Sequence, residues 1–389
     1  MANSRGNRRR FGSVRKLPSG RFQIRYPDPV TGVMRPGEET YPTKTDAEVA
    51  LTLIEADIKR EQWTDPDAGK VKFGDFADKW LKERKLEETT RERYEGVLRL
   101  HIKPALGGKF ISEITAARVR TWRTRLLEAG VGEPTVVKAY QLLRSIMTTA
   151  VDDELIKRNP CRIKGADVYD VPERPVLTVP EVYAVAAAIQ PQWRALVLLT
   201  AFTTLRLGEL AALHRRDVDL DARILWVRRN QAELGSGKLI TKAPKSRAGF
   251  RPVSFPDLIV PDLERHLERH AGRGQDGLFF VGPRGGTLRR SNFRDDWTAA
   301  KAKAGVSPDI HFHDVRHTGN NIAAQNGAST RELMTRMGHS TTRAALIYQH
   351  MTSDRDRAIA DKMGEAARKA LGEDDDPPDA SGTPVAQPE

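Results

Sequence analysis

The segment MGHSTTRAALIYQH, residues 337–350, contains near its end a tyrosine that could act as a nucleophile. His339 precedes Tyr348 by nine residues. A tyrosine hydroxyl has a pKa of about 10, so it attacks well only beside a base or beside positive charge. A tyrosine considered alone is more often a packed core aromatic. The interpretation of Tyr348 therefore depends on which other side chains could surround its hydroxyl.

One arginine interrupts an apolar stretch, TTLRLGEL, at residues 203–210. A charge among such residues is costly unless it is paired. Glu209 follows Arg206 by three residues and would share its face on a helix. The pattern predicts either a structural ion pair between these two residues or a cation held for an anionic ligand.

Two lysines lie in a basic stretch with the composition of a hairpin, TKAPKSRAGFRPVSF, residues 241–255. Lysines on a hairpin are usually solvated. Lys245 is our candidate for a functional lysine, and Lys242, three residues earlier, stays open as the alternative.

A histidine and an arginine three residues apart occur in HFHDVRHT, residues 311–318. On a helix His313 and Arg316 would share a face. The structural alternative is a surface histidine with Arg316 paired to Asp314.

The chain lacks the motifs of the common nucleotide-dependent and metal-dependent enzymes. It contains no G-x-x-x-x-G-K-[ST] loop, no H-E-x-x-H, no paired Cys/His spacing and no G-x-S-x-G. Chemistry on a phosphodiester would then use a covalent side chain and positive charge, with no cofactor, metal or ATP. Arginine suits this task because its guanidinium is planar, forked and always charged.

In this order and spacing, the four segments resemble the catalytic domain of the tyrosine recombinases, the phage integrase family. The matching features are R-x-x-E in LRLGEL, the basic stretch, H-x-x-R in HDVRH, and GHS followed by a tyrosine. The resemblance covers residues 175–365 and implies an enzyme that cuts and rejoins duplex DNA without metal or ATP. It implies specific roles for six residues: Arg206, Lys245, His313, Arg316, His339 and Tyr348.

The resemblance assigns these roles individually. Tyr348 would form a 3′-phosphotyrosyl bond, and Arg206 and Arg316 would hold the non-bridging phosphate oxygens. Lys245 would protonate the departing 5′-oxygen. His313 would accept the tyrosine proton, and His339 would hydrogen-bond the phosphate.

The elements that must position these side chains follow from residue patterns. Beyond a Pro-bearing linker, residues 175–371 mix helices and strands, and Thr178 with Glu181 predicts a helix N-terminus. The stretch WRALVLLTAFTTLRLGELAAL predicts two apolar helices, and RILWVRR and the basic stretch predict strands. We expect a mixed, mainly α catalytic domain. Residues 353–371 form a candidate helix, and the tail 372–389 is expected to be disordered.

Two further domains are expected before the catalytic one, so the fold class is multi-domain α+β. Residues 72–165 carry helical stripes of apolar residues and predict an all-α domain that resembles the family's core-type DNA-binding domain. Residues 1–65 predict three short strands and one helix, and they resemble the arm-type DNA-binding module. Capping boxes are expected at Thr45–Glu48 and at Thr89–Glu92.

Composition favours a polyanionic partner. The formal net charge is +12 and the pI is about 9.8. Residues 1–26 contain eight Lys and Arg and no acid, whereas residues 371–389 contain six acids and no base. Nucleic acid is therefore the leading partner, although many basic proteins bind none.

Several features bear on the compartment. The single cysteine, Cys161, allows no internal disulfide, and we expect it to be inert. The basic N-terminus is followed by no apolar run, and no run of about 18 apolar residues predicts a membrane span. We expect a bacterial cytoplasmic protein associated with the nucleoid.

The resemblance also implies binding partners, and two alternative functions stay open. A homotetramer would act on duplex attachment sites, and an excisionase and a host DNA-bending protein are possible additional partners. The alternatives are a type IB topoisomerase-like enzyme that relaxes DNA, and a non-catalytic DNA-binding regulator with the same fold. Loss of one of the six residues would favour the regulator, and none is lost.

Overall fold

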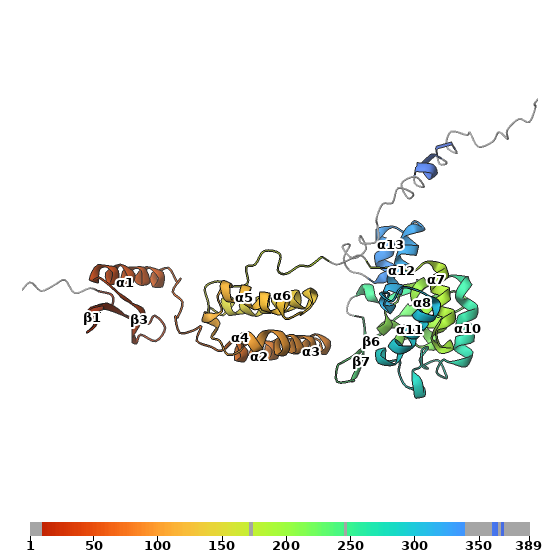
Figure 1. The fold of residues 1–389 in the computed structure, drawn as a ribbon, viewed down its shortest axis with the longest axis horizontal. Helices are drawn as coiled ribbons and strands as arrows, with labels where there is room; N and C mark the ends of the chain where they lie inside the picture. The colour runs from red at the N-terminus through yellow and green to blue at the C-terminus, as the bar shows by residue number, and fades with distance from the viewer. Residues whose placement is uncertain (1–9, 171–173, 245–246, 339–359, 365–366, 369–389) are drawn as a thin grey trace, which may run out of the picture. The chain divides into compact units, whose positions relative to one another are not determined.

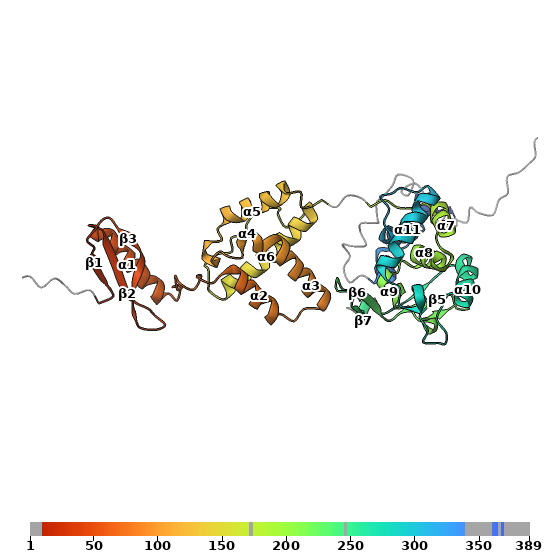
Figure 2. The same ribbon diagram turned by 60° about the horizontal axis from the view of Figure 1, so that its bottom comes forward.

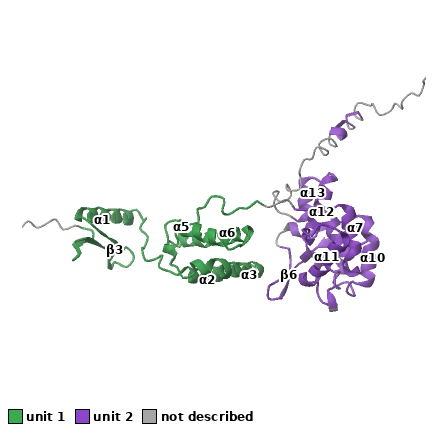
Figure 3. Cartoon of the chain, in the orientation of Figure 1, with its two compact units in different colours: residues 1–171 green, residues 172–389 purple. Residues whose placement is uncertain are grey.

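The chain divides into two compact units, residues 1–171 and 172–389, which are coloured separately in Figure 3. The computed structural model of the protein describes residues 10–170, 174–244, 247–338, 360–364 and 367–368. Three hydrophobic clusters are present in these residues: two in the first unit and one in the second.

The first unit begins with a three-stranded antiparallel sheet and one helix (Figures 1 and 2). These elements are β1 (Ser13–Lys16), β2 (Phe22–Pro27), β3 (Met34–Tyr41) and α1 (Lys44–Lys59). β2 is the central strand. Because side chains alternate along a strand, Phe22, Ile24 and Tyr26 all project to one face, where they pack with Leu51 of α1. The predicted arrangement of three strands and one helix is confirmed.

The rest of the first unit is helical, as the sequence predicts. Its elements are α2 (Phe73–Glu83), α3 (Glu88–Val97), a π-helical turn η1 (Leu98–Ile102), α4 (Lys103–Leu106), the 3-10 turn η2 (Ile111–Glu113), α5 (Ala116–Glu128) and α6 (Glu133–Asp152). The aromatic stripes form its core, where Trp80, Trp122 and Tyr140 are buried. Trp122 also donates its ring N–H to the carbonyl oxygen of His101 at 2.8 Å.

Two of the three predicted capping boxes are wrong by a few residues. The N-cap of α1 is Thr43, whose hydroxyl accepts from the backbone N–H of Asp46 at 3.1 Å. The same threonine-to-acid spacing occurs two residues before Thr45, so the helix starts there. α3 begins at Glu88, which places Thr89 inside the first turn. The Thr178–Glu181 box is confirmed, with both reciprocal hydrogen bonds formed.

The second unit is mixed and mainly helical, as predicted. Its helices are α7 (Val179–Ala188), α8 (Pro191–Thr203), α9 (Leu207–Ala211), α10 (Val260–Arg269), α11 (Arg290–Ala304), α12 (Phe312–Gln325) and α13 (Thr330–Met337). Its strands are β4 (Val218–Asp219), β5 (Ile224–Val227), β6 (Asn230–Glu233), β7 (Leu239–Lys242) and β8 (Arg251–Ser254). Short 3-10 turns complete it: η3 (Arg215–Asp217), η4 (Arg247–Gly249), η5 (Asp257–Ile259) and η6 (Pro283–Gly285).

Helix α8 is the centre of this unit. From Ala195 onward its residues are almost all apolar and buried, which is typical of a core helix, and it packs against α7, α10 and α12. It ends at Thr204, whose φ of 58° and ψ of 27° place it in the left-handed region. That residue reverses the chain and directs the next segment, which carries Arg206, into α9.

The basic stretch 241–255 is not a hairpin in the residues that the structure describes. β7 pairs with β6, whereas β8 pairs with β5 in the sheet β4-β5-β8. The stretch therefore links two separate sheets. This prediction was wrong because composition shows where strands end but does not show which strand each one pairs with.

Candidate active site

Arg206 and Glu209 are joined by a helix cap. Arg206 is the N-cap of α9 with extended backbone, so the two residues do not share a helix face as the sequence suggested. The Glu209 carboxylate accepts from the backbone N–H of Arg206 at 2.9 Å and from its Nη1 at 3.0 Å. The predicted pair is therefore present, and it fixes both the backbone and the side chain of Arg206.

A second arginine binds the same carboxylate. Arg251 on β8 donates from Nη1 and Nη2 to the two oxygens of Glu209, at 3.2 and 3.1 Å. Both side chains are buried. Burial alone would raise the pKa of Glu209, but the charge and hydrogen bonds of Arg251, together with those of Arg206, lower it. Glu209 is therefore ionised at neutral pH, and one negative charge serves two guanidinium groups.

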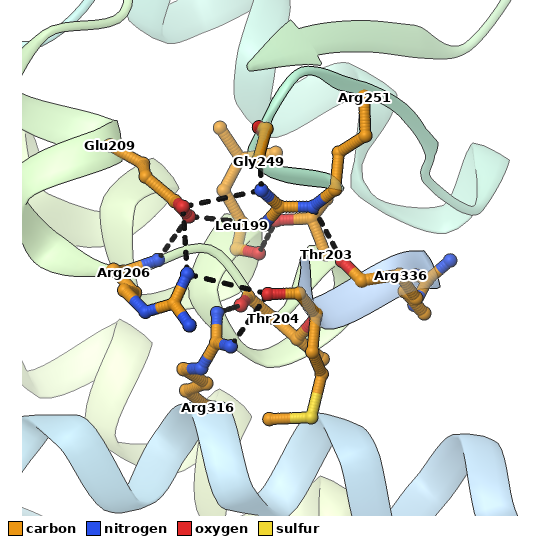
Figure 4. Close-up of polar contacts among 10 residues, drawn as sticks. Leu199, Thr203, Thr204, Arg206, Glu209, Gly249, Arg251, Arg316 and Arg336 are labelled. Carbon is orange, nitrogen blue, oxygen red and sulfur yellow. Dashed lines mark hydrogen bonds and ion pairs between the residues drawn. The ribbon is translucent and has the colours of Figure 1, made fainter. Parts of the chain in front are cut away.

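Three arginines meet the C-terminal end of α13 (Figure 4). Nη1 of Arg206 and Nη2 of Arg316 donate to the carbonyl oxygen of Met337, at 3.4 and 2.9 Å. Nε of Arg251 donates to the carbonyl oxygen of Arg336 at 2.8 Å. The last carbonyls of a helix are its negative end, so they attract cations. As a result, the two arginines predicted to bind phosphate converge on one carbonyl oxygen.

Arg316 is among the most deeply buried large side chains of the unit. It projects from α12, and its Nη1 also donates to the carbonyl oxygen of Thr204. Asp314 is bound instead by Arg174 at 3.8 Å and by His311 at 3.5 Å. The structural alternative of an Arg316–Asp314 pair is therefore wrong.

His313 lies one turn before Arg316 on α12, as the H-x-x-R spacing predicts. Its side chain is exposed, and its ring meets that of His317 edge-on with centroids 5.1 Å apart. Partial loss of hydration, followed by the neighbouring His317 and Arg316, lowers the pKa of His313 to about 4, and Arg206 contributes to the same shift. At neutral pH the imidazole is uncharged and able to accept a proton.

Three of the six predicted residues lie outside the described residues: Lys245, His339 and Tyr348. The structure therefore tests only the surroundings of Arg206, His313 and Arg316, which it brings together. Lys242, the alternative lysine, is the last residue of β7. Within the candidate helix 353–371, residues 360–364 and 367–368 are described and are helical. The other residues of this segment, and the whole tail 372–389, lie outside the described residues.

Sequence patterns alone did not identify Arg251 or Arg336 as members of this cluster. The guanidinium of Arg336 donates to the carbonyl oxygens of Phe202 and Ser254, and burial followed by the charge of Arg251 lowers its pKa. Arg251 did leave a signal. Within β8 it lies two residues before Val253, on the same buried face of the strand, so it faces inward and needs a partner.

Metal-binding groups and membrane-spanning helices are both absent from the described part of the chain. No group of three or more His, Cys, Asp or Glu residues there could hold a metal ion. No helix there is long and apolar enough to cross a membrane.

Known relatives match this chain along most of its length. A putative prophage phiRv2 integrase of Mycobacterium tuberculosis is 39% identical over 373 residues, which cover 92% of this chain and 96% of the relative. The integrase of Mycobacterium phage L5 is 37% identical, covering 93% and 99%. This chain belongs to the phage integrase family. Its members are tyrosine recombinases, and the chain is a tyrosine site-specific recombinase.

Family models match three parts of the recombinase. The model of the phage integrase family covers residues 176–355, that of the phage integrase N-terminal domain covers residues 10–60, and that of the N-terminal SAM-like domain covers residues 72–127.

Solved structures share the fold at low sequence identity. A Tn1549 transposon integrase, solved in complex with transposon right end DNA, is 21% identical with a TM-score of 0.67, covering 76% of this chain and 100% of that one. A lambda integrase dimer bound to a COC' core site is 18% identical with a TM-score of 0.56, covering 88% and 96%.

Proposed function

We propose that this recombinase integrates the DNA of a phage or another mobile element into a bacterial chromosome and excises it again. It cuts and rejoins duplex DNA through a 3′-phosphotyrosyl intermediate. The observation that carries the proposal is the convergence of Arg206 and Arg316 on the carbonyl oxygen of Met337. Two guanidinium groups aimed at one oxygen are the arrangement that a phosphate under attack requires.

In the proposed reaction, the Tyr348 hydroxyl oxygen bonds to a DNA phosphorus and the bond to the 5′-oxygen breaks. His313 takes the tyrosine proton, and Lys245 donates a proton to the leaving 5′-oxygen. A 5′-hydroxyl from the second duplex then attacks the phosphotyrosine and restores Tyr348. The phosphodiester is exchanged and never hydrolysed, so the cycle needs no ATP.

The remaining roles concern charge. Negative charge gathers on the non-bridging oxygens during the attack, and Arg206 and Arg316 stabilise it, assisted by a hydrogen bond from His339. Glu209 holds Arg206 in place without cancelling the charge of the cluster, because its single negative charge is shared with Arg251.

Three parts of the chain take three roles in this proposal. Residues 175–371 form the catalytic domain, residues 72–165 bind the core site, and residues 1–65 bind arm-type sites. The sheet of the N-terminal module supports the last assignment. Its face opposite α1, here called the open sheet face, carries Arg15, Arg21, Gln23, Arg25 and Thr40. Arginine with polar neighbours on an exposed sheet suits contact with phosphates and base edges.

Duplex DNA and further copies of the chain are the proposed partners. The Tn1549 and lambda integrases were solved with DNA, and a lambda integrase tetramer was solved on a Holliday junction. Exchange between two duplexes needs four strand cuts, which is why we propose a homotetramer on paired attachment sites. An excisionase and a host DNA-bending protein belong to the same proposal, and the place of action is the nucleoid in the bacterial cytoplasm.

The two rival functions are not favoured. Relatives that are named integrases match more than nine-tenths of this chain, including the part before the catalytic domain. A relaxing enzyme or a regulator would not require that shared organisation.

The test is covalent trapping on nicked DNA that carries the element's own attachment site, in EDTA and without ATP. The wild type is expected to form a protein–DNA adduct that survives denaturing electrophoresis, and Tyr348→Phe is expected to bind the DNA but form none. Tyr183→Phe is the matched control, because its buried hydroxyl has no partner in the described structure and should be dispensable. An adduct in Tyr348→Phe would refute the assignment of the nucleophile.

A further inference from the structure

We propose that Arg251 is a positioning residue for recombination, holding the loop that carries Lys245 and the chain that leads to His339 against Glu209. The inference rests on the proposed function, which supplies the roles of Lys245 and His339. It adds a residue that does not touch DNA itself. Arg251 holds the described backbone on the near side of each of these two residues, at Gly249 and at Arg336.

The contacts of Arg251 join three separate segments. Its Nη1 and Nη2 donate to the carboxylate of Glu209, which also binds the backbone and the side chain of Arg206. Its Nη1 also donates at 3.2 Å to the carbonyl oxygen of Gly249, which lies four residues after Lys245. Its Nε donates to the carbonyl oxygen of Arg336, three residues before His339. Figure 4 shows this guanidinium between Glu209, Gly249 and the end of α13.

Gly338 shows how closely the chain before His339 packs on this guanidinium. Its φ of 64° lies in the left-handed region, which ends α13. A Cβ on Gly338 would lie 2.8 Å from Nη1 of Arg251 and 3.1 Å from its Cζ. Both the backbone conformation and the space therefore require glycine, and the residue preceding His339 rests directly on Arg251.

Stability alone does not account for this arrangement. A buried ion pair is often no more stabilising than apolar side chains of similar volume, because both charges lose their hydration. A guanidinium, however, offers five donors in a rigid plane, and Arg251 uses them to fix a carboxylate and two backbone carbonyls at once. The planar guanidinium of Arg251 therefore holds three catalytic segments in fixed positions relative to one another.

The first experiment compares Arg251→Lys with Arg194→Lys. Arg194 is the matched control, since it also holds a carboxylate with two nitrogens in this unit, at 2.8 and 3.3 Å from Asp262, but away from the cluster. Adduct formation is measured in single turnover at saturating nicked DNA. Arg251→Lys is expected to be about 10- to 100-fold slower with DNA affinity within about twofold, because a small displacement of reacting groups costs rate and not binding. Arg194→Lys should keep the wild-type rate.

A second substrate separates positioning from a purely structural role. In DNA with sulfur at the 5′-bridging position, the leaving thiolate needs no proton from Lys245. The loss caused by Arg251→Lys is therefore expected to shrink several-fold on this substrate. An equal loss on both substrates would overturn the proposal, as would a wild-type rate on the ordinary one.

Folding is controlled by two further variants. Glu209→Gln with Arg251→Met removes both charges of the buried pair together and leaves only the partly exposed Arg206 without its carboxylate. This protein should melt close to wild type while forming the adduct slowly. Gly338→Ala should also slow the adduct. A double variant that folds and reacts at the wild-type rate would overturn the inference. A wild-type chain that formed no adduct would overturn the proposed function and this inference with it.

Discussion

Two sets of arginines in this recombinase are held in opposite ways. One set lies in the catalytic unit and the other on the open sheet face. The members of the catalytic set are Arg206, Arg251 and Arg316, and those of the sheet set are Arg15, Arg21 and Arg25.

The catalytic set is held on several sides. Arg316 is buried and its nitrogens reach two backbone carbonyls, while Arg251 reaches a carboxylate and two carbonyls. Side chains held so firmly have lost their freedom before any DNA arrives. That suits a task in which charge must already be in place when the transition state forms.

The sheet set is held loosely by its immediate neighbours. Arg15 donates to Gln23 at 2.9 Å and Arg21 to Thr40 at 2.7 Å, across adjacent strands and at the surface. Such contacts exchange readily with water or phosphate. One residue type therefore serves catalysis when several hydrogen bonds determine its geometry, and serves binding when it stays exposed and adaptable.

The largest expected effect concerns Arg316. Arg316→Lys keeps the charge but cannot reach the carbonyls of Thr204 and Met337 together. Single-turnover adduct formation is expected to fall about 100-fold or more, with DNA affinity changed only a few-fold. Arg331→Lys, at the exposed start of α13, is the control and should behave as wild type. Equal losses of rate and affinity in Arg316→Lys would remove the distinction between the two sets.

A smaller effect is expected from pH, and it should separate the two regions. His266 is buried and bonded to the carbonyl oxygen of Phe279 at 2.7 Å, and burial lowers its pKa to about 4 from 6.5. Above pH 6.5 it is neutral in both the folded and the unfolded states. As pH falls toward 4, the unfolded state binds the proton first, so the folded state loses stability. Between pH 7 and 5 this loss is about 2 kcal/mol.

Urea unfolding of the full chain at the two pH values measures this loss. The loss of stability between the two pH values should be smaller in His266→Gln than in the wild type. Part of the loss should remain, because the pKa of His313 is lowered in the same direction. No histidine occurs in residues 1–65, so arm-type DNA binding at low salt should change little over the same range. A full pH dependence in His266→Gln would contradict the assignment.

The smallest effect is expected on the open sheet face. Arg25→Ala should weaken binding to arm-type DNA by about 1 kcal/mol and reduce the salt slope by about 1, because one phosphate contact is lost. Cleavage of a core site should stay unchanged. Arg60→Ala, at the exposed end of α1, serves as the control. If both variants weakened binding equally, the open sheet face would not be the DNA-binding face.

Local patterns were reliable where neighbours in the chain decide the structure. The alternation in RFQIRY predicted which face of β2 is buried, and the Thr178–Glu181 spacing predicted the start of α7. The H-x-x-R spacing placed His313 and Arg316 one turn apart on α12. The caps of α1 and α3 were misplaced because several threonines near each start could serve equally well.

Local patterns could not predict contacts between residues that lie far apart in the sequence. The carboxylate of Glu209 binds Arg251, 42 residues away, and the Met337 carbonyl meets Arg206 from 131 residues away. Side-chain type gives no information about a backbone carbonyl, since every residue has one. The pairing of β7 with β6 and of β8 with β5 was likewise decided by packing.

By itself, then, the sequence determined the order and spacing of the chemistry-bearing residues, and with them the family and the kind of reaction, since motif and periodicity are local properties. Only the tertiary structure decided that Glu209 is shared by two arginines and that the end of α13 collects three. Buried charges must find partners wherever the fold brings them, and that search takes place in space and not along the chain.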